Sequence, residues 1–182
     1  MDGKEPFLNR MLRWMSHDVN ICMAGDANVG AMTLMLTDIA ALAGFYAGRT
    51  ELKLQNDHDE FVLFFEEFFD LAKDKRYDQL IYKLVKDKKK SIKDRCIIYD
   101  DFRCGVVHEH LMKQGTAIDK GLEKPYVFMS LSSGELTINI DHFFADYLNA
   151  LSKYADRVRN DANVADKFKK RAEYLGAYQP YL

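Results

Sequence analysis

The sequence predicts a mainly α-helical single domain with a small β-hairpin inserted before the C-terminal helices. Hydrophobic residues make up 48% of the 182 positions, whereas Gly and Pro number only 10 and 3. This composition excludes a disordered or fibrous chain and disfavours a turn-rich all-β fold. Residues 1–182 contain no linker, repeat or low-complexity tract, so a chain of this length is expected to form one domain.

The spacing of apolar residues predicts two helices in the N-terminal part of the chain. Residues 8–22 carry apolar side chains at three- and four-residue steps, as in a helix with one buried face, and Gly25 follows the end of this pattern. Residues 29–47 are apolar nearly all round, and Gly48 is suited to cap that helix. Because the second helix has no polar face, we expect it to run through the middle of the domain.

Three further helical segments are expected between residues 59 and 112. Asp59 can cap a helix with a dense, mostly aromatic stripe, which core packing explains without a ligand. The members of this stripe are Phe61, Phe64, Phe65, Phe68 and Leu71. A helix beginning near Tyr77 carries four cations on one face, namely Lys83, Lys86, Lys90 and Lys93. Another helix is predicted around residues 97–112.

Two short apolar runs in the C-terminal part predict strands. Residues 126–131 and 136–140 flank Ser132-Ser133-Gly134-Glu135, where Gly134 can take a positive φ, so they predict a β-hairpin. Asp141 can cap the long helix that follows. A last helix is marked by Val164, Phe168 and Leu175.

The cysteines and the N-terminus predict a cytoplasmic protein. Cys22, Cys96 and Cys104 are too few and too irregularly spaced for a disulfide framework. The first residues lack the basic head, apolar run and cleavage site of a secretion signal. Residues 29–48 have the length of a membrane span, but Asp38 near their centre would cost about 2.5–3.5 kcal/mol in a bilayer. We therefore expect a helix buried in a soluble core, and no membrane partner.

Several common chemistries lack their sequence motifs in this chain. There is no G-x-x-x-x-G-K-[ST] loop, G-x-G-x-x-G turn or G-x-S-x-G elbow, which removes the usual support for nucleotide hydrolysis, dinucleotide binding and α/β-hydrolase activity. His108-Glu-His110 is the only dense cluster of potential metal ligands. Residues two apart on a helix point about 200° from one another, so these histidines could bind one ion only in an extended stretch. We expect no metal and no cofactor.

The strongest candidate for chemistry is the pair Arg103 and His108, five positions apart in a mostly apolar run. Histidine, with an unperturbed pKa of about 6.5, can take or give a proton near neutral pH. Arginine stays charged and can hold a phosphate through two parallel hydrogen bonds. Together the two groups can cleave RNA without a metal.

Helix geometry leaves a structural alternative open. Five positions on an ideal α-helix separate two side chains by about 140°, so the pair would need a two-fold dimer to converge on one cleft. In the structural alternative, His108 is a hydrogen-bonded interior residue. Arg103 then forms an ion pair with Asp100, Asp101 or buried Asp38.

The Arg-x4-His spacing, near the start of a helix that follows several others, resembles the signature of the HEPN domain. This helical-bundle family contains many RNA-cleaving toxins and defence nucleases. Residues 36–48, 61–69 and 99–109 look like a bacterial HEPN-like group whose members are largely uncharacterised, and the resemblance runs from about Pro6 to Arg159. It implies an up-and-down helical bundle and a homodimer with the site near its interface. It also implies a metal-independent endoribonuclease, and an antitoxin-type protein partner if the protein belongs to a toxin–antitoxin system.

Carried over to matching positions, the resemblance makes Arg103 the phosphate-stabilising residue and His108 the proton-transfer residue. Active members often have a polar residue directly after the arginine, where this chain has Cys104. Some relatives are inactive binding or scaffold domains. The alternative function is therefore a non-catalytic dimeric helical module in which Arg103 and His108 are structural.

The basic helix face is the candidate substrate-binding surface. Cations near a cleft attract the phosphates of RNA, and this face supplies Lys83, Lys86, Lys90 and Lys93. The alternative is an ordinary solvated face, because the chain as a whole has a net charge of −2. Outside the core stripes, the C-terminal part carries Tyr174, Tyr178, Tyr181 and Arg171, which can bind a partner chain or lie against the bundle.

Overall fold

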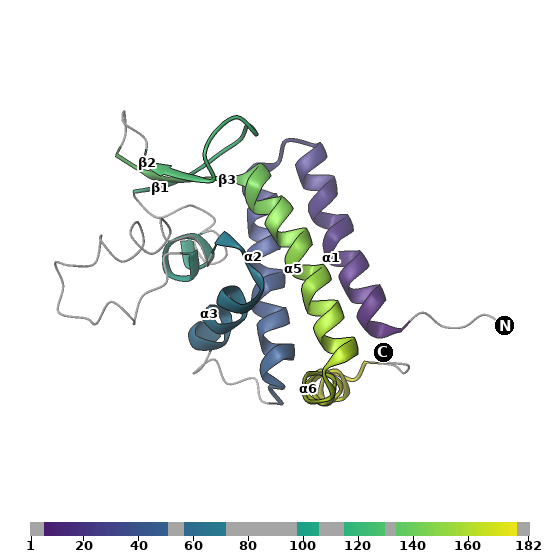
Figure 1. Ribbon diagram of the computed structural model, residues 1–182. Helices are drawn as coiled ribbons and strands as arrows, with labels where there is room; N and C mark the ends of the chain where they lie inside the picture. Colours follow the sequence, from purple (N-terminus) through teal and green to yellow (C-terminus); the bar gives the residue numbers. More distant parts are fainter. Residues whose placement is uncertain (1–5, 51–56, 72–97, 106–114, 130–133, 178–182) are drawn as a thin grey trace, which may run out of the picture.

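The computed structural model describes residues 6–50, 57–71, 98–105, 115–129 and 134–177 (Figure 1). Its helices are α1 (Phe7–Ala24), α2 (Asn28–Ala47), α3 (Asp57–Phe68), the π-helix η4 (Ile98–Arg103), α5 (Ile140–Asn160) and α6 (Ala162–Tyr174). Its strands are β1 (Thr116–Asp119), β2 (Val127–Met129) and β3 (Leu136–Asn139). The described part is mainly helical with one small sheet, which confirms the predicted fold class at this level. The helix predicted to begin near Tyr77 lies outside the described residues.

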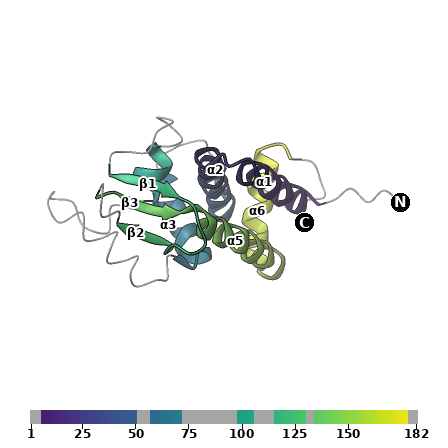
Figure 2. The same ribbon diagram turned by 90° about the horizontal axis from the view of Figure 1, so that it is seen from above.

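The central helix is α2, as its lack of a polar face predicted. It contacts α1, α3, α5 and α6, and its side chains are buried over much of its circumference. Seen from above, α2 stands between the sheet and the helices α1 and α6 (Figure 2). Gly48 adopts a φ of +72° and ends α2, and Gly25 follows α1, so both predicted helix ends are confirmed.

The apolar composition of α2 is explained by its neighbours in the bundle. Within the described residues it is the one helix long and apolar enough to cross a membrane by length and composition, and half of its most apolar stretch is buried inside the protein. Asp38, near its middle, accepts a hydrogen bond from the hydroxyl of Tyr147 on α5 at 2.7 Å. Packing against other helices therefore accounts for a sequence that also has the length of a membrane span.

The aromatic stripe of α3 forms the core with α5. All five predicted stripe residues are buried. The rings of Phe64, Phe65 and Phe68 meet those of α5, as in the pair Phe64 and Tyr154 with centroids 5.5 Å apart. Phe69 also packs on Phe143, with centroids 5.7 Å apart. The predicted start of this helix is wrong, because α3 begins at Asp57 and Asp59 lies within its first turn.

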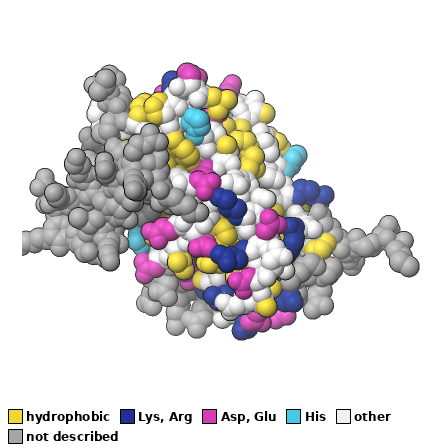
Figure 3. Space-filling view, in the orientation of Figure 1, with side chains coloured by type: hydrophobic (Ala, Val, Ile, Leu, Met, Phe, Trp, Pro, Cys, Tyr) yellow, Lys and Arg dark blue, Asp and Glu magenta, His cyan; other side chains and the backbone are white. Residues whose placement is uncertain are grey.

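Polar contacts join the end of α3 to α5. The buried carboxylate of Asp146 accepts the backbone N–H groups of Asp70 and Leu71 at 3.0 and 3.1 Å, which satisfies donors just after the end of α3. Lys153 pairs with Asp70 at 2.8 Å. Acidic and basic side chains accordingly alternate over the part of the surface in Figure 3 that covers these two helices. Such a surface is largely charge-paired.

The sheet contains the predicted hairpin and one strand that was not predicted. The strands β2 and β3 pair antiparallel with Val127 opposite Ile138, and Gly134 has a φ of +69°, as the hairpin prediction required. The strand β1 lies on the other side of β3 and runs parallel to it, giving the order β1-β3-β2. The prediction of a two-stranded hairpin is corrected to a three-stranded sheet.

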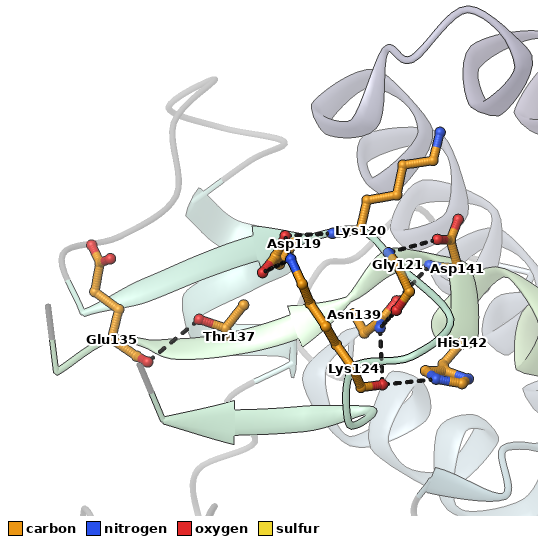
Figure 4. A network of polar contacts seen from close by, with 9 residues as sticks. All are labelled: Asp119, Lys120, Gly121, Lys124, Glu135, Thr137, Asn139, Asp141 and His142. Atoms are coloured by element: carbon orange, nitrogen blue, oxygen red, sulfur yellow. Dashed lines mark hydrogen bonds and ion pairs between the residues drawn. The ribbon is translucent and has the colours of Figure 1, made fainter. Parts of the chain in front are cut away.

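Asn139 joins the sheet to α5 (Figure 4). Its side-chain oxygen accepts the backbone N–H of Asp141 at 3.0 Å, and its Nδ2 donates to the carbonyls of Gly121 and Lys124 at 2.6 and 3.2 Å. Asn139 is therefore the N-cap of α5, and the predicted cap, Asp141, lies in the first turn. Asp141 instead accepts the backbone N–H of Gly121 at 2.9 Å. One buried amide thus fixes both the helix start and the connection between β1 and β2.

Replacing this amide is expected to destabilise the fold more than a surface change on the same helix. Asn139→Ala removes the cap and takes one hydrogen-bond donor from each of the carbonyls of Gly121 and Lys124, so we expect the free energy of unfolding to fall by about 2–3 kcal/mol. Asn149→Ala, which removes an exposed hydrogen bond to Asp70, should cost less than about 0.5 kcal/mol. Urea unfolding of both variants measures the difference, and equal losses would contradict the role given to Asn139.

The partly buried carboxyl of Asp38 has a perturbed pKa. Burial raises it to about 6; the hydrogen bond from Tyr147 opposes this shift, and the negative charge of Asp18 on α1 adds to it. An unfolded aspartate has a pKa of about 3.9. The folded protein therefore binds more protons here than the unfolded chain between about pH 4 and 6. The contribution of Asp38 to stability is fully present below pH 4 and is lost as the pH rises through 6.

Asp38→Asn is expected to remove this pH dependence. The amide oxygen can still accept the hydrogen bond from Tyr147, and it carries no charge. The advantage of the variant over the wild type should therefore grow by about 1–2 kcal/mol between pH 4 and pH 7. Denaturant unfolding at several pH values tests this, with Asp156→Asn, at an exposed aspartate of α5, as the control. A difference between Asp38→Asn and wild type that is constant with pH would refute the assignment.

Candidate functional site

Arg103 is the last residue of η4 and lies against the first turn of α3. Its Nη2 donates to Asp57 Oδ2 at 3.0 Å, and its Cζ lies 5.0 Å from the centroid of the Tyr99 ring. Its side chain is 14% exposed. Ile98 and Phe102 of the same turn are buried in the core, so packing fixes the backbone that presents Arg103.

The backbone around Arg103 differs from the α-helix expected over residues 97–112. Its described part is a π-helix, Ile98–Arg103. A π-helix has roughly 4.4 residues per turn, so groups five positions apart are separated by about 50° instead of about 140°. Within a turn of this kind, the argument that residues five apart face different directions does not hold. Such turns are rare and occur frequently at functional sites.

Asp57 is the centre of the contacts around Arg103. Its carboxylate accepts hydrogen bonds from Arg103, from the Tyr99 hydroxyl at 3.0 Å and from Arg49 Nη2 at 3.2 Å. Asp57 is also the first residue of α3, where the positive end of the helix dipole favours a carboxylate. Two guanidinium groups, a hydroxyl and a helix N-terminus therefore compensate one buried charge.

Tyr99 connects this carboxylate to a histidine. Burial, opposed by the charge of Arg103, raises the pKa of Tyr99 to about 12, so its hydroxyl stays protonated and donates to Asp57. The ring of His58 stands edge-on to Tyr99, with centroids 4.9 Å apart. Its Nδ1 lies 3.0 Å from Asp59 Oδ1, and its Nε2 lies 3.8 Å from an oxygen of Asp100. A titratable imidazole and a guanidinium thus contact the same aromatic ring.

Arg49 continues the cluster toward α6. Besides Asp57 it pairs with Glu60, and its backbone carbonyl accepts a hydrogen bond from Arg171 Nη1 at 2.8 Å. Burial and the charge of Arg49 both lower the pKa of Arg171. Two guanidinium groups, those of Arg49 and Arg103, therefore pair with two carboxylates, and a third, that of Arg171, contacts the backbone of Arg49.

The structure describes one of the predicted site residues. Arg103 takes part in the cluster, whereas His108 lies outside the described residues, and so do Lys83, Lys86, Lys90 and Lys93. Asp38, one expected partner of Arg103, binds Tyr147 instead. The sequence analysis missed Asp57, Arg49 and His58. Their signal is the acidic run that opens α3 and the arginine directly after the Gly48 cap, but neither indicates a contact with Arg103.

Within the described ranges, no group of three or more His, Cys, Asp or Glu side chains is arranged to hold a metal ion. The cluster around Asp57 is made of guanidinium, carboxylate, phenol and imidazole groups. Chemically, such a set can bind an anion at its arginines and transfer a proton at a histidine.

Comparison with protein families, with curated proteins and with solved structures finds no match. The resemblance to the HEPN domain therefore rests on the Arg-x4-His spacing and on residues 36–48, 61–69 and 99–109.

Asp57 is expected to contribute much more to stability than its neighbour Asp59. Asp57→Ala leaves Arg49 and Arg103 without their shared carboxylate, so the free energy of unfolding should fall by about 3 kcal/mol. The side chain of Asp59 is 87% exposed, and Asp59→Ala should cost less than about 0.5 kcal/mol. Chemical denaturation checks both values. A loss at Asp57 as small as that at Asp59 would show that the cluster contributes little to folding.

Proposed function

We propose that the protein is an HEPN-like protein acting on RNA, as a metal-independent endoribonuclease that uses Arg103 and His108. The observation that carries the proposal is the anchoring of Arg103 by Asp57 at 3.0 Å, over the ring of Tyr99. An arginine already held in one position loses little side-chain entropy when a phosphate binds. Its charge can stabilise the negative charge that grows as the phosphorus becomes five-coordinate.

In the proposed reaction, a histidine takes the proton of a ribose 2′-hydroxyl, and that oxygen attacks the adjacent phosphorus. The bond from phosphorus to the 5′-oxygen breaks, and the leaving oxygen receives a proton from an acid. The products are a 2′,3′-cyclic phosphate and a 5′-hydroxyl, so neither water nor metal is consumed. In a homodimer, the two copies of His108 supply the base and the acid.

The π-helical turn that ends at Arg103 supports the choice of this segment, because such turns occur frequently at functional sites. The separation of about 140° that disfavours a common site for residues five apart belongs to an α-helix, and Ile98–Arg103 is not one. The proposed cytoplasmic location and antitoxin-type partner rest on the sequence and on the HEPN resemblance.

A second candidate function is a non-catalytic dimeric helical module. The favouring observation is the same ion pair, because Asp57 ties η4 to α3 and accounts for Arg103 without any ligand. In this case Arg103 and His108 hold the fold or the interface together. The nuclease and the non-catalytic module use the same contacts of Arg103, and they differ in whether the protein cleaves RNA.

Incubation of purified protein with total RNA in the presence of a chelator tests the proposal. The wild type should cleave RNA, and His108→Ala should be slower by about 100-fold or more, as expected for loss of a proton-transfer group. Arg103→Lys keeps a cation beside Asp57 but removes the planar fork, so it should also cleave at least about 100-fold more slowly.

The control is Arg159→Lys, the same change at an exposed arginine paired with Asp156. It should cleave like the wild type, and circular dichroism should show that all variants fold. If the wild type cleaves no faster than His108→Ala, the nuclease proposal fails. Sedimentation of the wild type then tests the module, which requires a dimer.

A further inference from the structure

The side of α6 that meets the end of α2 carries a stripe of basic and aromatic side chains. Lys167, Arg171 and Tyr174 are spaced by four and three positions, so they lie on one side of the helix. We call these three residues the α6 stripe. In Figure 1, α6 crosses the end of the bundle where α2 and α5 finish, opposite the end where α5 begins.

Each member of the α6 stripe is held by a contact with its surroundings. The stem of Lys167 passes close to Gly48, and its Nζ lies 5.9 Å from the ring centroid of Tyr46. The guanidinium of Arg171 lies 5.5 Å from the ring centroid of Tyr174 while it donates to the carbonyl of Arg49. Tyr174 itself is 45% exposed. The exposed ring of Tyr174 is therefore in contact with the cation of Arg171.

The charge around Arg171 is not balanced by its described neighbours. Arg49 forms ion pairs with Asp57 and Glu60. Among the described residues, Arg171 has no ion pair. The buried Nε atoms of both arginines also lack an acceptor within the part of the chain that the structure describes. Burial and the charge of Arg49 lower the pKa of Arg171, opposed by Tyr174 and Glu60, and an anion bound beside the two adjacent guanidinium groups would relieve this effect.

We infer that the α6 stripe binds single-stranded RNA, with Lys167 and Arg171 at backbone phosphates and Tyr174 stacked on a base. The inference rests on the proposed function and adds the surface that receives the substrate. Contacts lead from the stripe to the site, since Arg171 touches Arg49 and Asp57 joins Arg49 to Arg103. A strand lying on α6 would be led toward the arginine proposed to hold the scissile phosphate.

The exposed ring favours a single strand over a duplex. Bases in a duplex are stacked on each other, whereas an unpaired base can stack on an aromatic side chain, and such stacking tolerates any sequence. Cations next to the ring add attraction for phosphates, and this attraction weakens with salt. Basic residues followed by an exposed aromatic ring are the combination that single-strand binding surfaces use.

Fluorescence anisotropy with a labelled oligouridylate of 12 nucleotides, measured in chelator, tests the inference with the full chain. The probe should be a non-cleavable 2′-O-methyl strand, so that binding is measured apart from cleavage. Tyr174→Leu should weaken binding by about 5- to 100-fold, and Tyr174→Phe should bind like the wild type because it keeps the ring. Lys167→Gln should make the salt dependence less steep by about 0.7 in the logarithmic slope.

The control is Lys120→Gln, which removes an exposed lysine that pairs with Asp26 at the other end of the bundle and should leave binding unchanged. Binding that is as strong in Tyr174→Leu as in the wild type would overturn the inference, and so would an equal affinity for a matched duplex or no binding at all. The cleavage test with Arg103→Lys is separate. Stripe-dependent binding without cleavage supports the α6 stripe and rejects the nuclease, whereas cleavage that needs Arg103 with no effect at the stripe does the reverse.

Discussion

The carboxylate of Asp57 is the contact on which the arrangement of α3, η4 and the end of α2 depends. Asp57 and Arg103 are 46 positions apart in the chain, yet their side chains meet at 3.0 Å. Removing a carboxylate from water costs several kcal/mol, and a single ion pair often fails to recover that cost. Here the carboxylate has donors from Arg49, Tyr99 and Arg103 and lies at a helix N-terminus. This number of donors is what makes the buried charge compatible with a stable fold.

A comparison with Asp38 shows what the arginines contribute. Asp57 is buried and Asp38 is partly buried, and both accept a hydrogen bond from a tyrosine. Asp38 has a neutral donor and a negative neighbour, Asp18, and its pKa rises to about 6. At neutral pH its charge therefore weakens the fold, whereas Asp57 has two guanidinium groups in contact with its charge. The two carboxyls thus have opposite electrostatic roles, and the sequence alone does not show this difference.

Local patterns predicted the helices well, because their evidence lies within one segment. The apolar spacing of α1 and α2 and the glycines that follow them give nearly the observed bounds. The residues that cap the helices were harder to predict than the helices themselves. Several Asp and Asn residues stand near each helix start, and the one that caps is decided by which side chain reaches the backbone. Asn139 does so while it also holds two loop carbonyls, and a period-two strand pattern gives no sign of this.

The contacts that join distant segments could not be predicted in this way. The strand β1 is only four residues long, and it is defined by parallel pairing with β3 instead of by a local turn. The spacing to His108 singled out Arg103 as a candidate, but nothing in the sequence indicates Asp57 as its partner. The π-helical form of η4 was also hidden, since the same apolar spacing fits an ordinary α-helix. Tertiary packing chose between the two.

The charge balance of the cluster limits where an anion can bind. Around Asp57 and Glu60, two carboxylates already face Arg49 and Arg103, so the interior part of the cluster has little positive charge left over. Arg171 adds a third guanidinium, and that excess lies on the side of α6. A phosphate that reached Arg103 alone would meet the negative charge of Asp57 at close range. A longer polyanion can also occupy α6, and the attraction at its other phosphates compensates that repulsion. The same contacts therefore favour a nucleic acid strand over an isolated phosphate as the ligand of this site.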